Sequence, residues 1–282
     1  MELEEINNLA SSDSTAWNKV EEANQYSLAK ILGIWAAAVL PMVTLSWIVF
    51  PAVSPDFKTD PLGAGLTRFV LLTVGLIWLF VLSMIIVYRE EGDLRWGTIR
   101  QRLWLNTPRD PKTGQPRGRL WLWLIPFIIL GIAYGIYLTP VIDRMWVSIF
   151  PFFSEPPGFG GGAFLESPEI QVQLVGAWWF FLLYFVSALF NTVLGEEFLF
   201  RGVLLPKMNG VFGKWDWVAN GTLFGLYHLH QPWSILASII DGILLFALPS
   251  RVFRSTWMAI ILHSLQSVFF LFLILGIILG LA

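Results

Sequence analysis

QVQLVGAWWFFLLYFVSALFNTVLGEEFLFR, residues 171–201, is the stretch that decides the fold. Positions 171–194 contain no Asp, Glu, Lys, Arg or His. About 20 apolar residues in a helix cross the roughly 30 Å hydrocarbon core of a bilayer, because a helix satisfies its own backbone hydrogen bonds there. We therefore expect this stretch to span a membrane, with Glu196, Glu197 and Arg201 directly behind the span.

The whole chain has the composition of a membrane protein. Of its 282 residues, 56% are hydrophobic and 13% are charged, whereas about a quarter are charged in soluble domains. Other stretches are long and apolar enough to cross a membrane, and two of them indicate a helical hairpin that turns near HQPW: 31–53, 69–88, 120–139, 217–230 with 234–249, and 256–281. The predicted fold is all-α, a polytopic membrane helix bundle of about 7–8 transmembrane helices.

Composition also excludes several classes of function. A net charge of -2 provides no basic surface for nucleic acid, and no Gly-rich phosphate loop follows a strand. The chain has no cysteine, so a disulfide framework, a thiol nucleophile and a thiolate metal site are all absent. The expected partners are a peptide or protein substrate and the lipid bilayer, with no nucleic acid.

Lys and Arg predict the orientation. Residues 89–119 form a strongly basic segment, which the positive-inside rule places in the cytoplasm together with the N-terminus. Only Lys58, Arg68 and Arg144, out of 18 Lys and Arg residues, then fall on the outer side. We expect an integral protein of the cell membrane.

A single membrane domain accounts for the chain. Residues 1–30 are expected to form a polar cytoplasmic tail. Residues 31–170 would hold the first three spans, with the basic cytoplasmic loop 89–119 and an outer loop at 140–170, and residues 171–282 would form the catalytic core. Within the basic loop, WGTIRQRLWL, residues 96–105, predicts a short amphipathic helical turn.

The two adjacent glutamates are expected to differ in role. On a helix Glu197 and Arg201 lie four residues apart on one face, in the favourable order for an ion pair, while Glu196 is rotated by about 100°. A carboxylate without a partner at a membrane boundary is by default a functional candidate. The alternative interpretation is that the three charges only mark the cytoplasmic end of the fourth span.

All three histidines fall in the apolar C-terminal third. His228 shares a helix face with Phe224, whereas His230 is two residues away and would point to nearly the opposite side, so we expect it to be interfacial and structural. His263 shares its face with Gln266 and Ser267. A carboxylate and two imidazoles in a dry cavity suit acid–base hydrolysis with water as the nucleophile.

Three motifs together resemble a known family. GEEFLFRG, FGLYH and ILHSLQS follow its pattern EExxxR, FxxxH and HxxxN, and their order is similar to that of the CAAX prenyl protease and bacteriocin-processing (CPBP, or Abi) family of glutamate-type intramembrane proteases. The resemblance covers roughly residues 171–275. It implies an endopeptidase that needs no metal or other cofactor and cuts a peptide bond near the cytoplasmic membrane face.

The resemblance also implies a role for each matching residue. Glu196 and His228 would activate a water, and Glu197 with Arg201 would hold the helices in place, supported by Phe224. His263 with a second donor would stabilise the oxyanion. The chain departs from the family at this donor, because Ser267 stands where the family has Asn, with Gln266 beside it.

Two other functions remain open on the sequence. A non-catalytic membrane immunity or assembly protein could keep this fold without turnover, as the loss of the usual Asn suggests. A zinc-dependent membrane hydrolase could use Glu196, His228 and His263 as ligands, because two His and one Glu leave a fourth position for water. The substrate, its lipidation and the oligomeric state are not encoded in any of these motifs.

Overall fold

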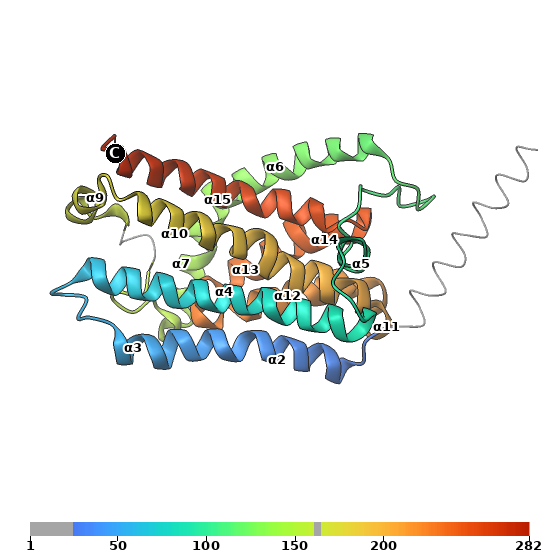
Figure 1. Ribbon diagram of the computed structural model, residues 1–282, viewed down its shortest axis with the longest axis horizontal. Coiled ribbons are helices and arrows are strands. Elements are labelled where there is room, and N and C mark those ends of the chain that lie inside the picture. The colour runs from blue at the N-terminus through green and yellow to red at the C-terminus, as the bar shows by residue number, and fades with distance from the viewer. Residues whose placement is uncertain (1–24, 161–164, 282) are drawn as a thin grey trace, which may run out of the picture.

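The computed structural model describes residues 25–160 and 165–281, and all regular elements within them are helical (Figure 1). The α-helices are α2 Leu28–Thr44, α3 Phe50–Val53, α4 Pro61–Glu91, α5 Trp96–Arg102, α6 Leu124–Ala133, α7 Thr139–Ile149, α9 Pro168–Leu174, α10 Trp178–Leu189, α11 Asn209–Phe212, α12 Asp216–Tyr227, α13 Ile235–Asp241, α14 Leu248–Phe253 and α15 Thr256–Ile278. Short 3₁₀ and π segments join several of them into longer rods. The prediction of an all-α helix bundle is confirmed.

Six continuous helical stretches are long and apolar enough to cross a membrane. Within the described part of the chain they are Leu28–Val53, Pro61–Glu91, Gly118–Ile149, Trp178–Lys207, Pro232–Phe253 and Thr256–Ile278. The protein is therefore an integral membrane protein. The span predicted at 217–230 corresponds to α12, which has 12 residues and is followed by a 3₁₀ turn at His228–His230. At about 1.5 Å per residue α12 is too short to cross alone, so the predicted number of spans is reached only when α12 is included.

The fourth span differs from its predicted limits. The stretch expected at 171–194 is divided: α9 is a separate short helix, and Gly176 adopts a positive φ of 76° before α10 begins. The helix then continues to Lys207 through the π segments Phe190–Gly195 and Phe198–Leu204. Glu196 and Arg201 consequently lie inside a long helix and are buried within the protein, so they are not solvated charges at a helix end.

The basic loop is attached to the fourth span. The helical turn predicted near 96–105 is present as α5, whose last residue, Arg102, is buried. Arg102 donates hydrogen bonds to Glu90 and to the backbone carbonyls of Gly202 and Val203. Tyr26 also bonds Glu90, so one buried cluster joins the start of α2, the end of α4 and the basic loop.

The predicted N-terminal tail and outer loop differ in how much of each the structure describes. Most of the tail expected at 1–30 lies outside the described residues, and α2 begins directly after Ser27, whose side chain accepts a hydrogen bond from the Lys30 backbone. The outer loop expected at 140–170 is partly helical, because α7 continues to Ile149. Its Thr139 and Pro140 fit the first turn of a helix, where Pro has no hydrogen bond to lose.

Close helix packing positions the C-terminal core. α12 lies against α13 and the π segment Gly242–Ala247 that follows it. A Cβ placed on Gly225 would lie 2.6 Å from the backbone nitrogen of Ile239, and one on Gly221 would collide with the backbone of Ile243. Glycines four residues apart allow two helix backbones to approach in this way. The approach brings the end of α12, with His228, beside the fourth span.

Candidate active site

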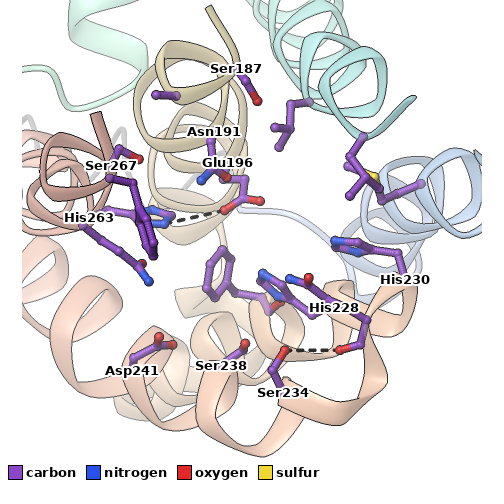
Figure 2. Close-up of a pocket in the computed structure, with 18 of the residues that line it drawn as sticks. Ser187, Asn191, Glu196, His228, His230, Ser234, Ser238, Asp241, His263 and Ser267 are labelled. Carbon is purple, nitrogen blue, oxygen red and sulfur yellow. Dashed lines mark hydrogen bonds and ion pairs between the residues drawn. The ribbon is translucent and has the colours of Figure 1, made fainter. Parts of the chain in front are cut away.

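Three separate passes of the chain meet at one cavity of about 370 Å³ (Figure 2). Glu196 comes from the fourth span, His228 from the turn after α12, and His263 from α15. All three side chains are at least nine-tenths buried. The structure thus brings together the carboxylate and two imidazoles that the sequence analysis singled out.

Glu197 joins two of these passes. Its Oε1 accepts a hydrogen bond from Nη1 of Arg201 at 3.2 Å, which is the ion pair predicted from their spacing. The same oxygen lies 2.9 Å from Nδ1 of His263, a contact between residues 66 positions apart. Arg201 also donates to the Gly242 carbonyl at 3.2 Å, so the pair connects the fourth span with both the α13 region and α15.

His263 faces both glutamates. Because Glu197 is paired with Arg201 and accepts hydrogen bonds, Nδ1 of His263 must be the donor in their contact. Nε2 of His263 then lies 4.0 Å from Oε2 of Glu196. The ring stacks on Phe246, with centroids 4.6 Å apart and planes at 23°. These contacts leave the imidazole little rotational freedom.

His228 has a defined tautomer. Its Nδ1 lies 3.0 Å from the backbone carbonyl of Phe224, and a carbonyl can only accept. The proton is therefore on Nδ1, and Nε2 carries the lone pair. His228 lies in the 3₁₀ turn directly after α12 and is buried. A neutral imidazole with an available lone pair is suited to accept a proton.

The turn that carries His228 is fastened by donors from three other helices. Trp47 Nε1 donates to the Leu229 carbonyl at 2.9 Å, and Trp146 Nε1 donates to that of Pro232 at 2.9 Å. The His230 carbonyl accepts from Ser46 Oγ at 2.9 Å and from Arg68 Nη2 at 3.2 Å. The end of a helix leaves backbone carbonyls without partners, and these contacts satisfy them inside the bundle.

The expected direction of the His230 side chain is wrong. It was expected at the interface, pointing away from His228, but it is buried and lines the same cavity. The expectation assumed a continuous α-helix, in which residues two apart point to nearly opposite sides. α12 ends at Tyr227, and in the turn the two imidazole rings stack with centroids 5.4 Å apart.

Both candidates for the second oxyanion donor line the cavity. Because adjacent residues on a helix are about 100° apart, we expected only one of the two side chains to face the cavity. Both line it, but Ser267 is buried whereas Gln266 is exposed. Ser267 lies one turn after His263 on α15, and Figure 2 shows both side chains on the same side of the cavity. The structure therefore keeps both residues within reach of the cavity.

Sequence reasoning missed several polar residues that line this cavity, and Asn191 and Asp241 are two of them. Asn191 lies in the π segment before Glu196, and Figure 2 shows the two side chains beside each other. Asp241 lines the opposite wall from the end of α13. Each interrupts an otherwise apolar predicted span, and a polar residue within a span is the signal that could have identified both.

The candidate zinc ligands do not form a metal centre. Within residues 25–160 and 165–281, no group of three His, Asp or Glu side chains has the geometry to hold a metal ion. Nδ1 of His263 contacts Glu197, and Nδ1 of His228 contacts the Phe224 carbonyl.

Comparison with known proteins places this site within a matched segment. The family model described as type II CAAX prenyl endopeptidase Rce1-like matches residues 177–269. This range contains every residue from Glu196 to Ser267 discussed above. No curated protein and no solved structure matches the chain.

Proposed function

Because residues 177–269 match the type II CAAX prenyl endopeptidase Rce1-like family, we propose that this protein is an intramembrane endopeptidase that uses an activated water. The observation that carries the proposal is the convergence of Glu196, His228 and His263 on one buried cavity, on top of the family match. The substrate is a peptide or protein segment that enters the bundle from the bilayer or from one of its faces.

Glu196 and His228 supply the base. A water between them transfers a proton to Glu196 or to Nε2 of His228 while its oxygen attacks the peptide carbonyl carbon. The C–N bond then breaks, and the proton passes to the leaving amine. The tautomer of His228 supports this role, because its hydrogen bond to Phe224 leaves Nε2 unprotonated.

His263 stabilises the oxyanion. Since Nδ1 already donates to Glu197, a neutral His263 has no proton on Nε2 and could not donate through it. The ring can donate through Nε2 only as an imidazolium, whose positive charge faces the carboxylates of Glu196 and Glu197. With Arg201, two cations would then balance two anions in this buried cluster. Glu197 and Arg201 act here as positioning residues.

The direction in which the cavity extends indicates the side from which a substrate reaches the catalytic groups. On α4 its lining residues extend from Leu76 back to Phe69, and on α15 from His263 on to Phe270. The cavity therefore extends from Glu196 away from the basic loop and toward the end of the bundle where α9 lies (Figure 1). If loop 89–119 is cytoplasmic, the cavity extends from Glu196 into the outer half of the membrane. Entry of the substrate from the cytoplasm and the orientation predicted from Lys and Arg are therefore alternatives. Measuring the side of the membrane on which loop 89–119 lies decides between them.

The proposal is tested by substrate trapping. We expect Glu196→Gln to abolish cleavage while the protein still folds, because the amide keeps the shape of the side chain but cannot accept the proton. Comparing membrane proteomes of cells with the parent and with Glu196→Gln should reveal a polypeptide that accumulates uncleaved on the variant. Glu169→Gln, on the exposed side of α9, is the matched control and should behave as the parent.

The same experiment tests the non-catalytic alternative. Ser267 in place of the family's Asn is the observation that favours an immunity or assembly protein, because it alters a predicted oxyanion donor. That function predicts identical proteomes and identical partners for the parent and for Glu196→Gln. The zinc hydrolase is tested by elemental analysis: we expect substoichiometric zinc and no inhibition by a chelator, and stoichiometric zinc lost together with activity would establish the metal.

A further inference from the structure

The cavity that holds the catalytic candidates has a second polar wall. Figure 2 shows Ser234, Ser238 and Asp241 in a row on the side of the cavity away from Glu196. Their spacing of four and three residues places them on one face of the helix that contains α13. Thr139 of the third span adds another hydroxyl group to the lining. Within the described residues no hydrogen bond joins this wall to the catalytic candidates, so it is available to another part of a substrate.

Asp241 is the acidic member of this wall, and it forms no ion pair with any described residue. Its Oδ1 is buried and has no hydrogen-bond partner in the described part of the chain. Arg201 acts on Asp241 electrostatically, but the guanidinium donates its hydrogen bonds to Glu197 and to the Gly242 carbonyl. A carboxylate in such a site is costly unless a cation accompanies it.

A second carboxyl group lies behind the same wall. Asp143 follows Thr139 by one turn on α7, and its Oδ1 is likewise buried with no hydrogen-bond partner among the described residues. The carboxyl groups of Asp143 and Asp241 act on each other electrostatically. They are held together because α7 packs against α13, where Tyr134 donates to the Ala237 carbonyl at 2.9 Å. Two like charges in one site raise the cost of leaving either without a cation.

The rest of the cavity does not supply that cation. The described residues that line it include no Lys or Arg. If His263 is an imidazolium, its charge faces the carboxylates of Glu196 and Glu197. The carboxyl groups in and around the cavity then outnumber the cations by four to two: Glu196, Glu197, Asp143 and Asp241 against Arg201 and His263. A ligand that brings a positive charge would reduce this imbalance.

We propose that Asp241 is a specificity-determining residue that binds the ammonium or guanidinium group of a Lys or Arg side chain on the peptide substrate. The charge sign carries this assignment, because a carboxylate without its own cation favours a cationic side chain over a neutral one. The hydroxyl groups of Ser234 and Ser238 can accept the N–H donors that the carboxylate leaves free. That the same peptide is cut beside Glu196 rests on the proposed function, whereas cation binding at Asp241 does not.

The cavity suits a peptide side chain better than a metal ion. Its volume of about 370 Å³ lies within the range of ligand pockets, roughly 300–1,000 Å³. In the described ranges no three His, Asp or Glu side chains are arranged to hold a metal ion. A peptide with its scissile bond at Glu196 can therefore direct one neighbouring basic side chain to the opposite wall.

The test measures binding to the Glu196→Gln protein, so that it does not depend on turnover. This variant also removes the other carboxyl group among the described lining residues. The probes are acetyl-Leu-Leu-Arg-Leu-Leu-amide and the same peptide with citrulline, which is neutral and close to Arg in shape, titrated into detergent-purified protein. A charge-assisted pair should make the Arg probe bind about tenfold or more tightly. Equal binding of the two probes overturns the proposal without any substitution at Asp241.

Variants locate the effect. Asp241→Asn, which keeps the shape of the side chain, should remove the preference for the Arg probe. Glu166→Gln removes an exposed carboxylate that lines a neighbouring cavity of about 480 Å³, and it should retain the full preference. A preference that survives in folded Asp241→Asn protein, or one that is lost in Glu166→Gln, would contradict the assignment.

Activity of the parent protein separates the possible failures. If Asp241→Asn abolishes a preference for the Arg probe but the parent cuts no peptide, the cation site stands and the proposed protease function fails. If the parent cuts peptides while the two probes bind equally, the protease function stands and the role of Asp241 is wrong. The role is also wrong if the probes bind equally while calcium ions bind the parent and not Asp241→Asn, because the carboxyl groups then hold an inorganic cation.

Discussion

At the scale of single residues, the site is a buried cluster of opposite charges. Glu197 and Arg201 are completely buried, and Glu197 accepts from both Arg201 and His263 through one oxygen. Burying charges costs several kcal/mol per ion unless each has partners, so every member of the cluster depends on the others. Glu196 differs because its close contact with a basic side chain in the described part of the chain is to Nε2 of His263, at 4.0 Å.

Removing Arg201 should therefore affect folding as well as activity. We expect Arg201→Ala to destabilise the protein by about 3 to 5 kcal/mol, because it leaves Glu197 buried without its cation. Thermal unfolding in detergent measures the change. Arg95→Ala, which removes one side of an exposed pair with Asp93, is the control and should leave the melting temperature nearly unchanged. An Arg201→Ala protein as stable as the parent would refute the pairing argument.

The second oxyanion donor is also a question about single residues. Ser267 is buried one turn after His263, so we expect Ser267→Ala to lower turnover by about 100-fold or more, whereas exposed Gln266→Ala should change it little. Ser267→Asn, which introduces the family residue, should preserve or raise turnover. The measurement is the single-turnover rate on a substrate identified by trapping.

Asn191 is the other candidate for the second oxyanion donor. Its amide lines the same cavity and lies beside Glu196 on the fourth span (Figure 2). If Asn191→Ala loses about 100-fold while Ser267→Ala keeps the parent rate, the fourth span and not α15 carries the donor. If both variants cleave at the rate of the parent protein, neither Asn191 nor Ser267 is the second oxyanion donor beside His263.

At the scale of elements, interruptions of α-helical geometry shape the site. The π segments on both sides of Glu196 widen the turn of the fourth span, and such segments are frequent at functional sites. The 3₁₀ turn after α12 places two imidazoles on one wall of the cavity. Both depend on neighbouring helices that supply hydrogen bonds and close packing.

The α12 to α13 contact should be intolerant of a single methyl group. In Gly225→Ala the new Cβ would meet the backbone of Ile239, which cannot move as a side chain would. We expect a loss of stability of about 1 to 3 kcal/mol and a larger loss of activity, because the displacement of α12 moves His228. Gly33→Ala in α2 is the matched control, since a Cβ there would meet no atom within 4 Å. Equal melting temperatures and rates for both variants would contradict this view of the contact.

At the scale of the whole molecule, orientation and cavity direction are linked. The buried cluster of Glu90, Arg102 and Tyr26 lies at the end of the bundle with the basic loop, while the cavity extends toward α9. Knowing which face of the membrane the basic loop occupies therefore determines the side from which a substrate reaches the catalytic groups.

We expect loop 89–119 in the cytoplasm, because 15 of the 18 Lys and Arg residues then lie inside. A Cys introduced at Thr113, in a chain that has no other, should be labelled by a membrane-impermeant thiol reagent only after the cell is permeabilised. A Cys at Asp56, in the loop between α3 and α4, should be labelled in intact cells. The reverse pattern would invert the orientation and give the cavity cytoplasmic access.

The sequence by itself determined the class of the fold and the identity of the catalytic candidates. Uncharged stretches of membrane length predict spans because every backbone group in lipid needs an internal partner. The pair of Glu197 with Arg201 was predictable because residues four apart on a helix are neighbours whatever surrounds them. The family resemblance likewise rested on short local motifs in a fixed order, and the match over residues 177–269 confirms it.

Only the tertiary structure decided which distant residues share the site. The contact of Glu197 with His263 joins two helices, and no local spacing encodes it. The burial of His230 follows from where α12 stops, and the position of Arg68 beside that turn follows from how α4 packs. These outcomes depend on the close approach of whole helices and on which groups remain to satisfy buried carbonyls, and both are properties of the assembled bundle.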